Sequence, residues 1–126
     1  MSVDPTGPDL KRFLGEDAGG EVVMLNLLRF KPDGGRERYA EYARAIAPFL
    51  ERVGGSVVYL GNTGTALVAP DAHDWDAVLL VRYPSRRAFS QMVADPAYQQ
   101  ITHLRTDALD AAVLQPTAPW PGGDRG

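Results

Sequence analysis

The sequence predicts an α+β domain whose elements follow in the order strand, helix, strand, strand, helix, strand. Residues 21–30 and 75–83 are apolar on both alternating rows, a pattern typical of strands in the centre of a covered sheet. Residues 36–53 and 84–105 instead repeat their apolar side chains with the period of an α-helix. Two strongly apolar strands and two amphipathic helical regions therefore indicate a sheet with helices packed on it.

The chain begins and ends with segments that are rich in proline and glycine. Residues 1–8 are predicted to be a flexible lead-in, and residues 9–14 a short helix that stops at the following glycines. Trp120 is a large apolar side chain in the otherwise flexible C-terminal tail, and we expect it to anchor the tail either on this subunit or on a partner. The predicted organisation is an N-terminal extension with a short helix over 1–20, one α+β domain over 21–116 and a flexible tail over 117–126.

The first strand, residues 21–30, has one polar side chain on each apolar row, Asn26 on one and Arg29 on the other. Buried amides usually find protein partners. Asn26 therefore either bonds to the neighbouring backbone or points into a cavity.

After a turn over residues 31–35, residues 36–53 form a long helix that stops at Gly54-Gly55. Pro48 lies opposite the apolar face and predicts a bend over residues 45–47, because proline removes a backbone hydrogen bond. Tyr39 and Tyr42 either pack in the core with hydrated hydroxyls or contact a ligand. The apolar face consists of Tyr39, Tyr42, Ala43, Ile46, Phe49, Leu50 and Val53.

Residues 56–60 are the second predicted strand, and residues 61–64 form a turn after which residues 65–69 continue the pairing. A loop over residues 70–74 leads into the third strand, 75–83. Arg82 lies near the end of this strand, where its guanidinium is expected to reach water.

Two helical stretches follow, joined at Asp95-Pro96, and Ser85 is the N-cap of the first. The second runs from Pro96 toward residue 110, and on its apolar face Arg105 stands where leucine is expected. The guanidinium must reach solvent, pair with a buried carboxylate, or meet an anionic or hydrogen-bonding ligand, because an unpaired buried charge is very unfavourable. His103 falls on the outer face, and residues 111–115 form a short final strand.

Composition argues against several classes of protein. With 13 Lys+Arg, 16 Asp+Glu and a net charge of -3, the 126-residue chain has no basic block or stripe suited to nucleic acid. No apolar run approaches the roughly 20 residues of a membrane-spanning helix, and no signal-peptide layout is present, so we expect a cytoplasmic protein that does not bind membranes. Cysteine is absent and the two histidines, His73 and His103, are far apart, so we expect neither a metal site nor a cofactor.

The element order is that of the split βαβ, or ferredoxin-like, arrangement: a four-stranded antiparallel sheet with helices on one face. The other face would then expose a larger apolar area than soluble monomers usually tolerate. We therefore predict a homodimer in which two sheets pack face to face as an α/β barrel.

Four stretches also resemble a known family: VVMLNLLRFKP, YAEYARAIAPFLERVGG, DWDAVLLVRYPSRRAFSQMVADPAYQQITHLR and the closing strand. Over residues 21–116 they are similar to the domain-of-unknown-function family 1330 (DUF1330), within the dimeric α/β-barrel superfamily. The resemblance implies a ferredoxin-like subunit, dimerisation through the sheet and a pocket between sheet and helices, with no established reaction. The chain departs from the family pattern in its Gly-rich turn, KPDGGRE, and in lacking an acidic-Gly pair before Asp74-Trp75, so its pocket is expected to be lined differently.

Polar side chains on otherwise apolar faces are the candidates for a ligand pocket: Asn26, Tyr39, Tyr42, Trp75, Tyr83 and Arg105. A mostly apolar lining with a few polar groups is the usual form of a small-molecule site, and these donors suit a small, partly apolar, anionic or oxygenated metabolite. They would stabilise an oxyanion or enolate, although no base is evident. Three hypotheses follow: a cofactor-independent enzyme of isomerase, cyclase or monooxygenase type, a non-catalytic small-molecule binder, and a structural or interaction dimer without a pocket.

Overall fold

The computed structural model describes residues 3–121 and contains the predicted order of elements after one N-terminal helix. The elements are α1 (Gly7–Gly15), β1 (Val22–Phe30), α2 (Gly35–Arg52), β2 (Ser56–Asn62), β3 (Ala77–Tyr83), α3 (Arg86–Ala94), α4 (Pro96–Gln99), α5 (Thr102–Thr106) and β4 (Leu109–Thr117). The strands form one antiparallel sheet in the order β2-β3-β1-β4, so the two doubly apolar strands are central as predicted. The predicted α+β class and the four-stranded sheet are confirmed.

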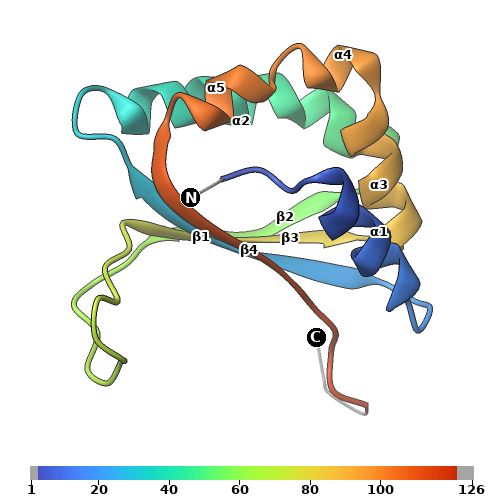
Figure 1. Cartoon of the computed structure of the whole chain (residues 1–126), viewed down its shortest axis with the longest axis horizontal. Coiled ribbons are helices and arrows are strands. Elements are labelled where there is room, and N and C mark those ends of the chain that lie inside the picture. Colours follow the sequence, from blue (N-terminus) through green and yellow to red (C-terminus); the bar gives the residue numbers. More distant parts are fainter. Residues whose placement is uncertain (1–2, 122–126) are drawn as a thin grey trace.

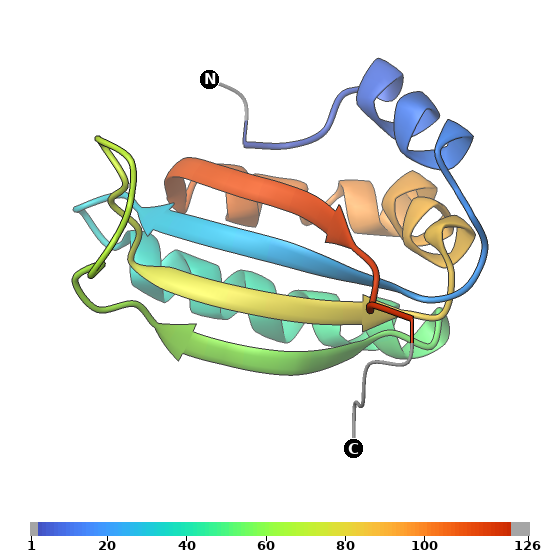
Figure 2. The same ribbon diagram turned by 90° about the horizontal axis from the view of Figure 1, so that it is seen from below.

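Helices α2 to α5 lie on one face of the sheet (Figure 1). In the view from below, α2 runs behind β3 and β2, whereas α4 and α5 lie behind the β4 side (Figure 2). The core fills the space between these layers, and the sheet contributes to it alternate side chains of its central strands, among them Val22, Met24, Leu28, Ala77, Val81 and Tyr83. The other face of the sheet keeps a half-buried apolar row on each central strand, and none of the described helices covers it (Figure 1).

The described part of the N-terminal extension differs from the predicted lead-in. Helix α1 begins at Gly7 because Thr6 and Asp9 form a capping box, in which each side chain accepts a hydrogen bond from the other residue's backbone N–H, at 3.2 Å and 2.8 Å. Residues 3–6 run beside the outer edge of β4, between the level of the helices and that of the sheet (Figures 1 and 2). They are therefore part of the packed domain. Residues 1–2 lie outside the described range.

Strand β2 is longer than predicted. Gly61 and Asn62 continue its pairing with β3, opposite Val78 and Ala77, so the predicted turn over residues 61–64 is wrong. Residues 65–69, predicted to continue the pairing, instead belong to the β2–β3 loop. They have no strand to pair with, because β3 itself begins at the residue opposite Asn62.

The single helix predicted from Pro96 toward residue 110 is two short helices, α4 and α5. At the junction the backbone N–H groups of Gln100, Ile101 and Leu104 donate to carbonyls three residues back, at 3.3, 2.9 and 3.1 Å, so the regular α-helical pattern is interrupted. Leu109 leaves the helical region because it pairs with Phe30, so β4 begins earlier than predicted.

The C-terminal end of the domain also differs from the prediction, since β4 extends to Thr117, the first residue of the predicted tail. Trp120 is 86% exposed and is therefore not anchored on its own subunit. The last residues of the predicted tail, 122–126, lie outside the described range. Helix α2 continues through Pro48 to Arg52, and the kink or bend near residues 45–47 stays a prediction. Within residues 3–121, we find no helix with the length and apolar character needed to cross a membrane.

Candidate functional site

A cavity of about 280 Å³ lies between the sheet and the helices above it. Its lining is mostly apolar, and Asp4 and Arg105 are the only charged residues among the described residues that line it. The row of β1 and β3 that faces the helices contributes Asn26 and Tyr83, and α2 contributes Tyr39 and Tyr42. Five of the six candidate residues thus lie around one cavity.

Two glycines in the KPDGGRE turn fix the start of α2 above this cavity. Gly34 has a φ of 79°, a left-handed conformation that glycine adopts without strain. A Cβ at Gly35 would come within 2.5 Å of the Ala108 carbonyl oxygen, so only glycine lets α2 begin this close to the turn between α5 and β4. The Lys31 N–H donates to the same carbonyl at 2.9 Å. This Gly-rich turn therefore brings the first tyrosines of α2 close to Arg105.

Arg105, on α5, is a buried charged residue with 5% exposure. Its Nη1 donates to Asp4 Oδ1 at 2.7 Å and also to the Val3 carbonyl oxygen. Its Nη2 is buried and has no hydrogen-bond partner among the described residues. Burial excludes the predicted alternative of reaching solvent. The arginine instead combines an internal carboxylate with one donor that the protein leaves unused.

Four buried tyrosines line the cavity together with Arg105: Tyr39, Tyr42, Tyr83 and Tyr98. The hydroxyl oxygens of Tyr42 and Tyr98 are hydrogen-bonded at 2.8 Å. Burial raises the pKa of Tyr39 to about 12, although the nearby charge of Arg105 opposes the rise. Burial likewise raises the pKa of the other three hydroxyls. At neutral pH these groups stay protonated and act as hydrogen-bond donors or acceptors, not as bases.

Asn26 combines the two alternatives predicted for it. It is 5% exposed, and its Nδ2 lies 3.4 Å from the Met24 carbonyl oxygen and 3.5 Å from that of Leu79. Both distances are long for a hydrogen bond, and the residue also lines the cavity. The Asn26 amide is therefore a second donor that a ligand could engage at small cost.

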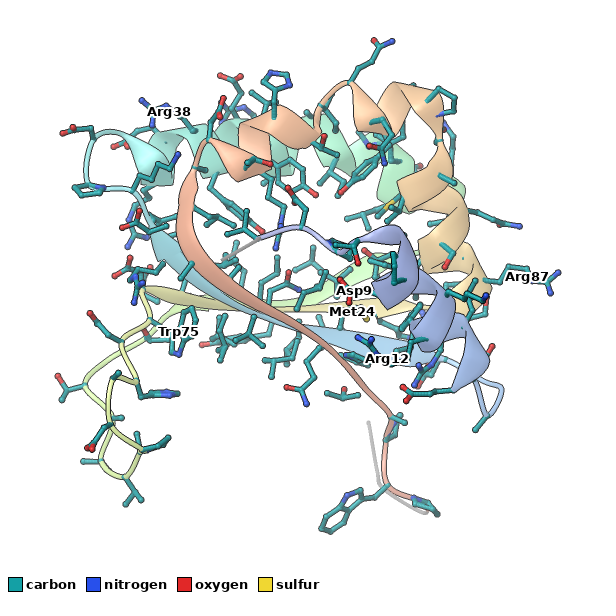
Figure 3. The ribbon with its side chains drawn as sticks, in the orientation of Figure 1. Asp9, Arg12, Met24, Arg38, Trp75 and Arg87 are labelled. Carbon is teal, nitrogen blue, oxygen red and sulfur yellow. The ribbon has the colours of Figure 1, made fainter. Side chains whose placement is uncertain are left out.

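Trp75 does not line the cavity, which corrects its place among the candidates. Strand β3 begins only at Ala77, so Trp75 belongs to the end of the β2–β3 loop. Its ring lies 6.0 Å from the guanidinium of Arg29, a residue of the β1 row that points away from the helices. Figure 3 shows Trp75 at the loop end of the sheet, well away from Met24, which does line the cavity. Both alternating rows of residues 75–83 are apolar, so the sequence does not show whether Trp75 points toward the helices or away from them.

Two lining residues that hydrogen-bond to the candidates, Tyr98 to Tyr42 and Asp4 to Arg105, were missing from the predicted site. Tyr98 shares the apolar face of Arg105 directly after Asp95-Pro96, so the periodicity that singled out the arginine also indicated this tyrosine. Asp4 gave no such signal, because it is 101 residues from Arg105 and lies in a segment predicted to be flexible.

The arrangement can bind an oxygen acceptor and surround it with apolar surface. Arg105, Asn26 and the tyrosines offer donors, and the apolar residues offer contact area. Within residues 3–121, no three His, Asp or Glu side chains gather in a way that could hold a metal ion.

The chain is similar in sequence to a protein family and to a solved protein. The family model described as "Domain of unknown function (DUF1330)" matches residues 34–115. The crystal structure of RPA0582, a protein of unknown function from Rhodopseudomonas palustris, is 36% identical, has a TM-score of 0.85, and matches over 94% of this chain and 96% of that one. No curated protein matches the chain.

More distant solved structures share the fold. A dimeric ferredoxin-like protein of unknown function from Jannaschia sp. CCS1 is 11% identical with a TM-score of 0.60, over 79% of this chain and 99% of that one. The hydroxynitrile lyase from Passiflora edulis is also 11% identical with a TM-score of 0.60, over 77% of this chain and 91% of that one. At such identities these likenesses show the ferredoxin-like fold and nothing about activity.

Proposed function

Because the chain belongs to the family described as "Domain of unknown function (DUF1330)", whose description assigns no activity, we propose a function from its own cavity. The protein binds a small, mostly apolar metabolite that presents an oxygen acceptor to Arg105. The Nη2 atom of Arg105 carries this proposal, since it is buried beside the cavity without a hydrogen-bond partner among the described residues. Leaving such a donor unpaired costs about 1–3 kcal/mol, and a bound acceptor would recover that free energy.

Binding is favoured over catalysis by the chemistry of the lining. Among the described residues that line the cavity there is no histidine or lysine, and the one carboxylate, that of Asp4, is paired with Arg105. The raised pKa of the lining tyrosines makes them poor bases near neutral pH. A small-molecule binder therefore fits the cavity better than an enzyme of isomerase, cyclase or monooxygenase type.

The methionines offer a direct test of ligand binding. Met24 and Met92 both line the cavity, so their methyl resonances should shift when a small aromatic carbonyl or carboxyl compound binds. A panel of such compounds would be titrated into protein labelled at the methionine methyls. Arg105→Met should abolish the shifts. Arg44 is an exposed arginine that does not line the cavity, so Arg44→Met should leave the shifts unchanged.

Two further results complete this test. Leu79→Trp, which would fill the cavity from its sheet side, should remove binding while the fold is retained. A panel in which no compound moves either methyl resonance, or in which Arg105→Met binds as well as the wild type, would contradict the proposal.

The protein is also proposed to act as a homodimer through the uncovered sheet face. Val23, Leu25 and Leu27 of β1 and Val78 and Leu80 of β3 are only half-buried there. A row of this kind on both central strands is the apolar surface that a second sheet would cover. The distant relative from Jannaschia sp. CCS1 is described as dimeric, which agrees with this proposal.

Sedimentation equilibrium tests the dimer. Leu80→Asp should convert the protein to monomers, because it places a charge in the centre of the proposed interface. Arg87→Asp introduces the same residue on the exposed side of α3 (Figure 3) and should leave the dimer intact. A wild-type protein that sediments as a monomer at high concentration would contradict the dimer without affecting the cavity.

A further inference from the structure

We infer that the ligand carries a carboxylate, that this carboxylate replaces the carboxylate of Asp4 on Arg105, and that residues 3–6 are therefore an internal competitor for the cavity. This inference rests on the proposed function, and it adds the chemical class of the ligand and the way in which the protein itself controls access.

The N-terminal segment occupies the site from one side. Asp4 and Pro5 line the cavity, and Val3 and Asp4 supply the two acceptors of Arg105 Nη1. In Figures 1 and 2 the segment lies along the β4 edge, at the height of the space between helices and sheet. A molecule that accepts a hydrogen bond from Arg105 Nη1 therefore competes with this segment for the same donor.

Charge balance allows the cavity one anion at a time. Asp4 and Arg105 are the only charged residues among the described residues of the lining, so their charges cancel. An anionic ligand bound beside Asp4 would place two negative charges against one arginine in mostly apolar surroundings, where like charges repel strongly. An anion must consequently take the place of Asp4.

The hydrogen-bonding pattern around Arg105 favours the carboxylate of a ligand over the carboxylate of Asp4. Asp4 divides its oxygens, with Oδ1 on Arg105 Nη1 at 2.7 Å and Oδ2 on the Thr106 hydroxyl at 2.6 Å. Arg105 Nη2 is left over. A free carboxylate is not tied to the chain and can accept from Nη1 and Nη2 together, the paired geometry that makes arginine a carboxylate receptor. The ligand thereby gains one hydrogen bond that Asp4 does not make.

Release of Asp4 from Arg105 is eased by the exposure of its carboxylate to solvent. Its side chain is 37% exposed, whereas that of Arg105 is 5% exposed, so the carboxylate is already in contact with solvent. The Thr106 hydroxyl keeps an acceptor when Asp4 leaves, since it also lies 3.3 Å from the Thr102 carbonyl oxygen. A second cavity of about 310 Å³ is lined by the segment and α1 on one side and by residues of β1 and β4 on the other, so residues 3–5 have room to move although Val3 packs against the core.

Isothermal calorimetry with a matched pair of probes tests the competition. The probes are 2-naphthoate, which carries a carboxylate, and 2-naphthamide, its neutral counterpart of nearly the same shape. Asp4→Asn keeps the size of the side chain and removes its charge. Asp107→Asn removes an equal charge from an exposed residue just after α5 that does not line the cavity, and it controls for long-range electrostatics.

The inference predicts that Asp4→Asn strengthens naphthoate binding by about tenfold or more. Without its charge, residue 4 no longer occupies Arg105, so a larger fraction of the protein is free to bind naphthoate. Naphthamide affinity should change by less than about twofold, and Asp107→Asn should change neither affinity. Saturating naphthoate should also speed amide hydrogen exchange at the hydrogen-bonded N–H groups of Thr6, Asp9 and Leu10 in the wild type, whereas naphthamide should not.

Each other outcome has a distinct meaning. If naphthamide binds but Asp4→Asn strengthens both probes equally, or weakens naphthoate, the cavity binds ligands and the competition by Asp4 is wrong. Naphthoate bound in the cavity with unchanged exchange at Thr6, Asp9 and Leu10 also overturns it. If neither probe binds any variant and no compound moves the Met24 and Met92 methyls, the proposed function fails, and this inference fails with it.

Discussion

Replacing Arg105 by methionine should change the stability of the protein very little, although the side chain is almost completely buried. Methionine keeps the length and apolar contacts of the arginine stem and removes only the guanidinium. The substitution therefore isolates the free energy of the charged group.

Two opposing contributions set the expected size of the change. The loss is the hydrogen bonding to Asp4 and Val3, where a bond to a charged group is worth about 1.5–3 kcal/mol. It is reduced here because the Asp4 side chain is 37% exposed and can turn to water. The gain is that Nη2 is no longer buried without a partner, which otherwise costs about 1–3 kcal/mol. We expect a net change within about 1 kcal/mol of zero, against about 3–5 kcal/mol for breaking a fully buried ion pair.

Urea denaturation followed by far-ultraviolet circular dichroism measures this difference. All variants must be compared at one protein concentration, because the stability of a dimer depends on it. Leu28→Ala is the reference, since Leu28 is 0% exposed and its truncation should cost about 2–5 kcal/mol. If Arg105→Met lowers the free energy of unfolding by as much as Leu28→Ala with the same m-value, Arg105 is a structural residue and the reasoning for a ligand site is refuted.

Three other predictions follow from the same geometry. Gly35→Ala should destabilise by roughly 2 kcal/mol because its Cβ would meet a backbone carbonyl oxygen at 2.5 Å, whereas Gly7→Ala, with nothing within 4 Å, should be neutral or slightly stabilising in urea melts. Tyr42→Phe should cost about 1–2 kcal/mol by leaving the Tyr98 hydroxyl without its partner, and adding Tyr98→Phe should recover part of that loss; additive effects in this double-mutant cycle would contradict the pairing. The stability that comes from Tyr39 should be unchanged between neutral pH and about pH 10 and be lost as the pH rises toward about 12, because the folded protein keeps the Tyr39 proton that the unfolded chain releases. Urea midpoints that do not fall between pH 10 and pH 12 would disprove it.

The types and order of the elements were predictable because periodicity is a local property of the sequence. The doubly apolar rows of β1 and β3 marked the centre of the sheet, and the repeat of α2 marked its helix. The boundaries that were wrong depend instead on partners distant in the chain. Residues 65–69 have a sequence suited to a strand but no neighbouring strand to pair with. Leu109 continues a helical pattern but pairs with Phe30. Tertiary pairing overrode local preference at both places.

In the candidate site, too, local features were predictable from the sequence and contacts between distant residues were not. This difference matters most for Arg105. A polar residue on an apolar face is visible in sequence, which is why Arg105, Asn26 and the tyrosines of α2 were found. What Arg105 meets depends on a contact across 101 residues, and no local pattern encodes it. From the sequence alone, an internal carboxylate and a ligand are alternative partners for Arg105. The geometry makes them compatible, because a carboxylate shared with Thr106 leaves Nη2 of the same guanidinium unused. A purely structural ion pair would gain by satisfying that donor, so an unpaired Nη2 beside a cavity supports the proposal that Arg105 binds Asp4 and a ligand in turn.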